Sequence, residues 1–194
     1  NAATDGNGRY ILTVTADEEW INDSETVLPV RIDPSIIKSY SFAYFDDAYV
    51  MSGANYINGN YSTSPLLLLG RHAGMGYGRA YYKVDLASMP EGTEMIRSAK
   101  LHLMMNLSQS SRNAVSIVCK RPLTAWNTNT ITWSNQPELD SNIMDYEVFA
   151  ADASSLDIDI TKAFASDYYN GTELGFAIVC ENESESLPAL AIGS

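Results

Sequence analysis

Apolar and polar residues alternate with a period of two along much of the chain. Between 99 and 105 the odd positions are all apolar, and Lys100, His102 and Met104 stand between them. Between 79 and 86 the order is reversed, and the apolar residues stand at the even positions. Because successive side chains of a strand point to opposite faces, this alternation predicts strands with one face in a core and one face in solvent.

Turn-forming residues interrupt these stretches about every ten residues, which is the spacing of short strands in β-sandwiches and barrels. We therefore predict an all-β protein, a jelly-roll-like antiparallel β-sandwich. One short helix is expected near residues 160–169, with Asp159 or Thr161 as the N-cap and Asn170-Gly171 as the stop. Such a helix would cover one end or edge of the sandwich.

The length of 194 residues fits one domain with a short additional element. Residues 1–36 are predicted to form a hairpin-like segment, with strand-like runs at Tyr10–Thr15 and Val27–Ile32 around an acidic loop that holds Trp20. This segment is too small to bury a core alone, so it either packs on the sandwich or is the tail of a preceding region. Residues 37–194 are assigned to the sandwich module.

The formal net charge is −12. Nucleic acids and anionic membrane surfaces repel a protein of this charge, so neither is predicted as a partner. The chain contains no apolar run near 18 residues, the length that predicts a transmembrane helix. No cofactor is expected.

The two cysteines, Cys119 and Cys180, end two strand-like runs and share the parity of their apolar neighbours. Both are expected to point into the core, either as buried thiols or as a disulfide. They are too few and too widely spaced for a structural zinc site.

Trp126 and Trp133 stand seven residues apart in the stretch "TAWNTNTITWSNQP". They could form a surface platform for sugars or fill a core. If a strand continues through 131–134, Trp133 shares a face with Ile131, and we expect that face to be buried. Trp126 is also expected to be largely buried, where the chain crosses a sheet edge.

The most basic and aromatic stretch is "GRHAGMGYGR", residues 70–79, and the strand that continues from it. It could be no more than a flexible hairpin loop. As a binding patch, it would use Arg71, His72, Tyr77, Arg79, Tyr81 and Lys83. By parity, Arg79, Tyr81 and Lys83 share the solvent face of one strand, and their cations would favour uronic acids through charge-assisted hydrogen bonds.

Asp46 and Asp47 are adjacent at the start of a predicted strand. They could help to hold a structural calcium ion, which binds carboxylate and carbonyl oxygens, or they could be solvated edge carboxylates. No His-Glu-x-x-His or Gly-x-Ser-x-Gly pattern occurs in the sequence, and no pair of carboxylates can be assigned as a glycosidase acid and base. An enzyme is therefore not predicted.

Several motifs together resemble the DNRLRE domain, a secreted β-sandwich module. They are "GRAYYKVDL", "SAKLHL", "ITWSNQP", "DIDITKAF" and "GTELGFAIV", and the similarity covers residues 42–192. The N-terminal "LPVRIDP" resembles the segment that precedes such domains in large YD-repeat (RHS-like) wall-associated proteins of Gram-positive bacteria. The chain departs from the family at "ALAIGS", where a longer final strand is expected, so the last strand could be missing.

The resemblance implies a noncatalytic module of a large exported bacterial protein, secreted or bound to the cell wall. Related modules attached to polysaccharide lyases bind alginate-type acidic polysaccharides, which makes a cell-envelope or acidic polysaccharide the expected ligand. A second hypothesis is a structural spacer or cap that contacts only other parts of its parent protein. A third, with least support, is a polysaccharide lyase or glycosidase.

Overall fold

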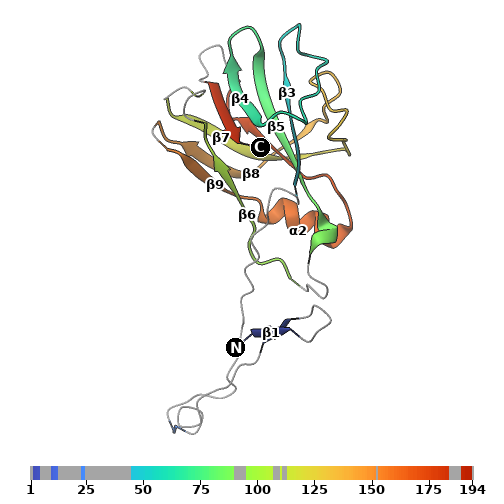
Figure 1. The fold of residues 1–194 in the computed structure, drawn as a ribbon, viewed down its shortest axis with the longest axis vertical. Helices are drawn as coiled ribbons and strands as arrows, with labels where there is room; N and C mark the ends of the chain where they lie inside the picture. The colour runs from blue at the N-terminus through green and yellow to red at the C-terminus, as the bar shows by residue number, and fades with distance from the viewer. Residues whose placement is uncertain are drawn as a thin grey trace. The chain divides into compact units, whose positions relative to one another are not determined.

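The computed structural model describes residues 2–4, 10–12, 23–24, 45–89, 95–106, 110, 113–151, 153–183 and 189–193 (Figure 1). The chain divides into two compact units, residues 1–39 and 40–194. In the first, β1 (Ala2–Thr4) pairs antiparallel with β2 (Tyr10–Leu12). The predicted strand at 27–32, Trp20 and the boundary predicted between 36 and 37 lie outside the described residues.

In its described residues, the larger unit is built from antiparallel strands and one α-helix, which confirms the predicted all-β sandwich. Its strands are β3 (Phe45–Met51), β4 (Leu66–His72), β5 (Gly76–Val84), β6 (Lys100–Met104), β7 (Val115–Pro122), β8 (Leu139–Phe149), β9 (Ser155–Asp159), β10 (Phe176–Cys180) and β11 (Ala189–Gly193). A 3-10 turn, η2 (Leu86–Ser88), follows β5, and α2 (Thr161–Asn170) precedes β10.

Strand β5 joins the parts of the main sheet. Strand β3 pairs with β5 along the whole length of β3. Strand β4 pairs with the first residues of β5, and β10 pairs with Ala80–Tyr82 of β5. The order across the sheet is β11-β4-β5-β10-β7-β8. Strands β6 and β9 form a separate pair that is linked to β11 by a bridge between Met105 and Ile192.

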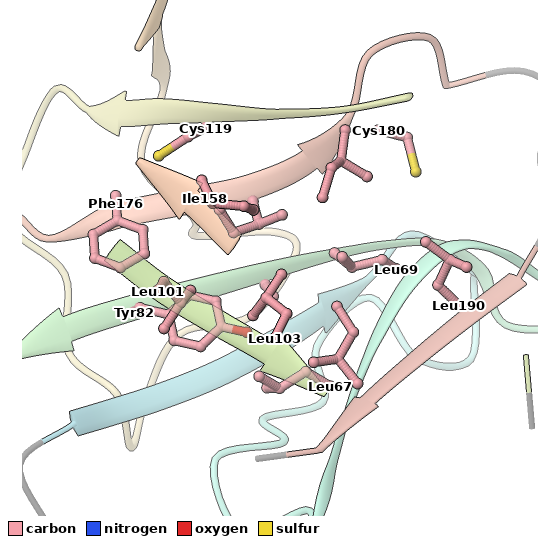
Figure 2. Packing of buried hydrophobic residues seen from close by; sticks show 14 of the residues in the cluster. Leu67, Leu69, Tyr82, Leu101, Leu103, Cys119, Ile158, Phe176, Cys180 and Leu190 are labelled. Atoms are coloured by element: carbon pink, nitrogen blue, oxygen red, sulfur yellow. The ribbon is translucent and has the colours of Figure 1, made fainter. Parts of the chain in front are cut away.

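The interior is formed by the apolar faces that the alternation predicted. Leu101 and Leu103 of β6 are buried, while His102 and Met104 between them are exposed. Figure 2 shows these leucines among side chains from β4, β5, β9, β10 and β11, which pack with them in one cluster. The Tyr82 and Phe176 rings stack there with centroids 5.4 Å apart.

Both cysteines are buried in this cluster as free thiols. Cys119 lies opposite Ile178, and Cys180 lies opposite Ile117, so the two cysteines are diagonal neighbours on β7 and β10. Burial raises the pKa of each thiol to about 12. Of the two alternatives that the sequence left open, the structure shows the buried thiols.

The helix lies where the sequence placed it, but its start differs. Ile160 is the N-cap and makes no side-chain cap bond, whereas Asp159 accepts a hydrogen bond from the Thr161 amide at 2.8 Å. Neither predicted residue, Asp159 nor Thr161, is therefore the N-cap. The helix ends at Gly171 with a φ of 61°, the left-handed conformation that glycine adopts without steric cost, as the Asn-Gly stop predicted.

A largely buried ion pair fixes α2 to the sheet. Both Asp167 oxygens accept hydrogen bonds from Arg121 of β7, and Oδ2 also accepts one from the Gly175 amide at 2.8 Å. Arg121 donates in addition to the carbonyl oxygens of Ala163 and Gly175. The sequence analysis did not single out this pair, because its members are 46 residues apart.

The segment that departs from the family pattern forms a strand. Residues Ala189–Gly193 pair with Leu66–Gly70 of β4, and Leu190 and Ile192 enter the core. Its alternating apolar residues form a strand at the edge of the sheet beside β4. The absence of a longer last strand stays a prediction.

Candidate functional site

The outer face of β3, β5, β7 and β10 carries a second buried cluster. It contains Ala48, Val50, Tyr81, Val118, Trp126, Ile131, Ala177 and Val179. Side chains from residues 123–138 cover this face. These residues form the segment between β7 and β8 (Figure 1). We call residues 123–138 the covering segment. The sheet is therefore buried on both sides here, which period-two alternation alone does not predict.

The covering segment is held in place mainly by hydrogen bonds rather than by strand pairing. Asn127 makes a local turn in which its side chain accepts from the Asn129 amide at 3.0 Å and its carbonyl oxygen accepts from the Ile131 amide at 2.9 Å. Asn60, in the loop after β3, donates to the carbonyl oxygens of Thr128 and Ile131, both at 2.8 Å. These bonds fasten two loops that are far apart in the sequence.

Trp126 anchors the covering segment on the sheet. Its side chain is buried, and its indole N–H donates to the Leu174 carbonyl oxygen at 2.8 Å. Its ring meets the Tyr81 ring edge-on, with centroids 5.4 Å apart. The predicted burial of Trp126 is confirmed, and the partner that a buried indole N–H needs is present.

Trp133 differs from its prediction. Residues 131–134 form turns rather than a strand, so Trp133 does not share a strand face with buried Ile131. Trp133 is half-buried at the margin of the second cluster, and the Arg79 guanidinium lies 4.6 Å from its ring centroid. The prediction of a core tryptophan was wrong because the Thr132 amide bonds to the Asn135 side chain at 2.7 Å, which closes a turn.

The three predicted ligand residues of β5 lie together, but they do not form an open face. Tyr81 is fully buried, which raises its pKa to about 12, and it donates a hydrogen bond to Gln136 at 2.7 Å. Arg79 makes two bonds to Glu183, at 2.7 and 2.8 Å. The expectation of a solvent face was wrong for Tyr81, because the covering segment lies over it.

The other three predicted ligand residues lie at the β4–β5 hairpin. The alternation of β4 shifts at Gly70, which has a φ of 75°, so that exposed Arg71 stands opposite Tyr77. His72 is half-buried with its Nε2 3.0 Å from the Leu69 carbonyl oxygen, and burial lowers its pKa. A binding role for Arg71, His72 and Tyr77 stays a prediction.

Lys83 lies at the edge of a polar cleft of about 460 Å³. The cleft is lined by Phe45, Asp46, Asp47, Ser62, Thr63, Lys83, Asn127, Thr128, Asn129 and Glu173. Four parts of the fold contribute: the β3–β5 pair, the loop after β3, the Asn127 turn and the residues between α2 and β10. A second depression of about 430 Å³ lies on the covering segment and shares Asn127 with the first.

Asp46 and Asp47, proposed from sequence as calcium ligands, both line this cleft. Asp46 is exposed and stands directly opposite Lys83 in the β3–β5 register. In the part of the chain that the structure describes, no three His, Cys, Asp or Glu side chains are grouped so that they could hold a metal ion. A calcium role for this pair stays a prediction.

The polar cleft residues that the sequence analysis missed are Ser62, Thr63, Asn127, Thr128, Asn129 and Glu173. Each is an ordinary turn or loop residue in its local sequence. The only available signal was the Asn-Thr-Asn turn directly after a tryptophan that was expected to be buried. Together these side chains offer hydroxyl, amide and carboxylate groups, which can donate to and accept from the hydroxyl groups of a bound molecule.

The main sheet is buried on both faces, and a polar cleft lies beside it. This architecture suits a binding module. The model of carbohydrate-binding module family 96 matches residues 38–191, and the chain belongs to this family. The match confirms the predicted resemblance to a carbohydrate-binding module. Modules of this kind are noncatalytic. Among the described residues, no helix is long and apolar enough to cross a membrane.

The chain is also similar to part of three much longer proteins. These are the tRNA nuclease WapA of Bacillus subtilis strain 168, the tRNA3(Ser)-specific nuclease WapA of Bacillus spizizenii and the tRNA(Glu)-specific nuclease WapA of Bacillus subtilis subsp. natto. Each is 49% identical over 55 residues, a stretch that covers 28% of this chain and 2% of the relative.

Proposed function

We propose that this chain is a noncatalytic module of a large exported bacterial surface protein and that it binds polysaccharide in the polar cleft. The observation that carries the proposal is the cleft itself, found in a chain of a carbohydrate-binding family. Its volume of about 460 Å³ falls within the roughly 300–1,000 Å³ of typical small-molecule sites. A glycan of the cell envelope is the ligand we favour.

The walls of the cleft are fixed before any ligand arrives. Asn60 holds the Asn127 turn through the Thr128 and Ile131 carbonyl oxygens, and Lys83 holds the Trp126 carbonyl oxygen at 2.5 Å. A preformed site loses less conformational entropy on binding than a mobile one. Phe45, at the start of β3, supplies an aromatic surface against which the apolar face of a sugar ring can pack.

The exported context rests on sequence similarity. The motifs resemble those of wall-associated repeat proteins, and the similar proteins from Bacillus are far longer than the stretch they share with this chain. Their names assign them a tRNA nuclease activity. We assign this chain binding rather than cleavage, because the family to which it belongs is one of binding modules.

Glycan-array screening followed by affinity electrophoresis tests the proposal. Retention by at least one bacterial envelope polysaccharide is expected. Thr63→Trp, which fills the cleft from an exposed position, should abolish that retention. Thr124→Trp is the matched control, since Thr124 is exposed and lines neither depression.

Two results would overturn the proposal. Equal retention of both tryptophan variants would place binding outside the cleft. Failure of the folded chain to bind any glycan would favour the structural spacer hypothesis instead.

A further inference from the structure

Residues 172–175, between α2 and β10, supply part of the wall of the polar cleft, and we call them the connecting loop. Glu173 of this loop is exposed and lines the cleft. The next residue, Leu174, accepts the indole N–H of Trp126 at its carbonyl oxygen, at 2.8 Å. The connecting loop therefore reaches the cleft through one residue and the anchor of the covering segment through its neighbour.

One buried carboxylate holds the connecting loop. Asp167, on α2, is only 5% exposed. Its Oδ1 accepts from the Thr172 hydroxyl at 2.6 Å and from the Leu174 amide at 3.1 Å, and its Oδ2 accepts from the Gly175 amide at 2.8 Å. Both chain neighbours of Glu173 are thus bonded to one side chain. Because these donors converge on a buried carboxylate, the bonds are strong and favour one arrangement of the loop.

Arg121 fixes the orientation of this carboxylate. It donates to both Asp167 oxygens, and its Nη1 also donates to the Gly175 carbonyl oxygen at 2.8 Å. Arg121 belongs to β7, so the connecting loop is tied to the main sheet as well as to the helix. Charge-assisted hydrogen bonds of this kind are shorter and stronger than neutral ones. These contacts therefore limit movement of the loop relative to the sheet.

Two routes lead from Asp167 to the walls of the cleft. The first is the backbone on either side of Glu173, which Asp167 holds directly. The second runs through Leu174, whose amide donates to Asp167 and whose carbonyl oxygen accepts from Trp126. The Asn127 turn, which forms another part of the cleft wall, follows Trp126 directly.

We infer that Asp167 is a positioning residue for the cleft: although buried, it sets the placement of Glu173 and of the Asn127 turn, and through them the affinity for polysaccharide. The inference rests on the proposed function and says how that same site is held in its binding form. Sites gain precision when hydrogen bonds from a supporting layer lock the groups that contact a ligand. A site already in its bound geometry also loses less entropy on binding. Weakening the Asp167 contacts should therefore lower affinity in a chain that still folds.

Thr172 offers a mild test of this role. Thr172→Val keeps the shape of the side chain but removes its bond to Asp167, whereas Thr172→Ser keeps the hydroxyl. Affinity electrophoresis is run with peptidoglycan glycan strands and with each polysaccharide that wild type retains on the array. The Kd of Thr172→Val should rise by roughly two- to thirtyfold, the range for changes that act on a site through intervening contacts. Thr172→Ser should bind like wild type.

Two further variants complete the series. Asp167→Asn, checked for folding by circular dichroism, should weaken binding at least as much as Thr172→Val, because the amide replaces one of the two accepting oxygens. Asn170→Ala is the control at the same end of α2. It removes hydrogen bonds to Ser166 and should leave the Kd near that of wild type.

The Trp126 indole signal separates positioning from a purely structural role. Spectra of the ligand-free ¹⁵N-labelled chain contain this signal, which is assigned by its loss in Trp126→Phe. Thr172→Val should move the signal and the amides of Asn127–Asn129, because the Leu174 carbonyl oxygen shifts with the connecting loop. Asn170→Ala should leave them in place. A role confined to stability would lower the unfolding midpoint without moving these signals.

Wild-type affinity in both Thr172→Val and folded Asp167→Asn would overturn the inference and leave the proposed function intact. So would weaker binding with unchanged Trp126 and Asn127–Asn129 signals, since Asp167 would then not act through the connecting loop. If Asp167→Asn does not fold, the two Thr172 variants decide alone. If wild type binds no glycan, the proposed function falls and this inference falls with it.

Discussion

Lys83 contacts Trp126 in two ways: its ammonium donates to the Trp126 carbonyl oxygen at 2.5 Å and lies 4.7 Å from the centroid of the indole ring. One residue belongs to β5 and the other to the covering segment, 43 residues away in sequence. Because the Asn127 turn follows Trp126 directly, this contact positions one wall of the cleft. The buried cluster on the outer face of the sheet, which contains Trp126, and the candidate binding site are therefore held together by the same contact.

Replacing Lys83 with Met should weaken both stability and binding. The change removes a charge-assisted hydrogen bond and a cation–π contact, for an expected loss of about 1–3 kcal/mol in the free energy of unfolding. Urea unfolding followed by circular dichroism measures this loss. Lys162→Met, an exposed change on α2, is the control and should leave both quantities near wild type.

The two tryptophans should differ in their contribution to stability. Trp126→Ala removes a buried ring and leaves the Leu174 carbonyl oxygen without its indole donor, so a loss of about 3–5 kcal/mol is expected. Trp133→Ala should cost less, because its ring is only half-buried and stacks under Arg79. Urea unfolding of the two variants in parallel gives the comparison, and an equal or larger loss for Trp133→Ala would contradict the structure.

The Arg121–Asp167 pair should be the most sensitive polar contact of α2. Asp167→Ala leaves the largely buried Arg121 guanidinium without its carboxylate, and breaking a buried pair in this way typically costs about 3–5 kcal/mol. Thermal or urea unfolding checks the value. Glu181→Ala, at an exposed position, should stay within about 0.5 kcal/mol of wild type. A loss for Asp167→Ala no larger than this control would show that the pair does not hold the helix.

Stability should fall on the alkaline side of pH 9. The pKa of Cys119 and of Cys180 rises from 9.0 in the reference state to about 12 in the folded protein, and that of Tyr81 rises from 10.0 to about 12. The two thiols and the Tyr81 hydroxyl therefore lose their protons at lower pH in the unfolded chain than in the native protein. Raising the pH through this range favours unfolding. Their contribution to stability is complete below pH 9 and is lost as pH rises toward 12.

Urea midpoints measured between pH 8 and 11 test this expectation. The double variant Cys119→Ala, Cys180→Ala is less stable overall, but its midpoint should fall less steeply with pH. In parallel, the native thiols should react slowly with Ellman's reagent at pH 8, and both should react in denaturant. Fast reaction of the native protein would contradict the burial of the two cysteines.

Much of the fold was predictable because it follows local rules. The alternation around Leu101 and Ala80 identified strands and their core faces, and the Asn170-Gly171 stop identified the end of the helix. These signals need only the neighbouring residues, since they follow from strand parity and from the conformational freedom of glycine.

The outer-face cluster was not predictable in the same way. Tyr81 and Lys83 occupy polar parity positions, but each combines an apolar body with a polar end, so each also suits a covered surface with a polar partner. Their partners, Gln136 and Trp126, are 55 and 43 residues away. Nothing local to β5 shows that the covering segment lies over it.

The cleft was missed for a related reason. Ser62, Asn127 and Glu173 come from separate loops, and each is typical of a solvated turn when considered alone. Their meeting depends on long-range hydrogen bonds such as those of Asn60 to the Asn127 turn. The sequence therefore placed the ligand at the β4–β5 hairpin, where basic and aromatic residues gather locally.

The most direct test of the central claim is NMR mapping of the ¹⁵N-labelled chain titrated with a glycan that it retains on the array. Binding in the cleft predicts that the largest amide shifts occur at Ser62, Thr63, Asn127–Asn129 and Glu173. The account would be contradicted if those amides stayed unchanged while Arg71 and Tyr77 shifted, because binding would then lie at the hairpin.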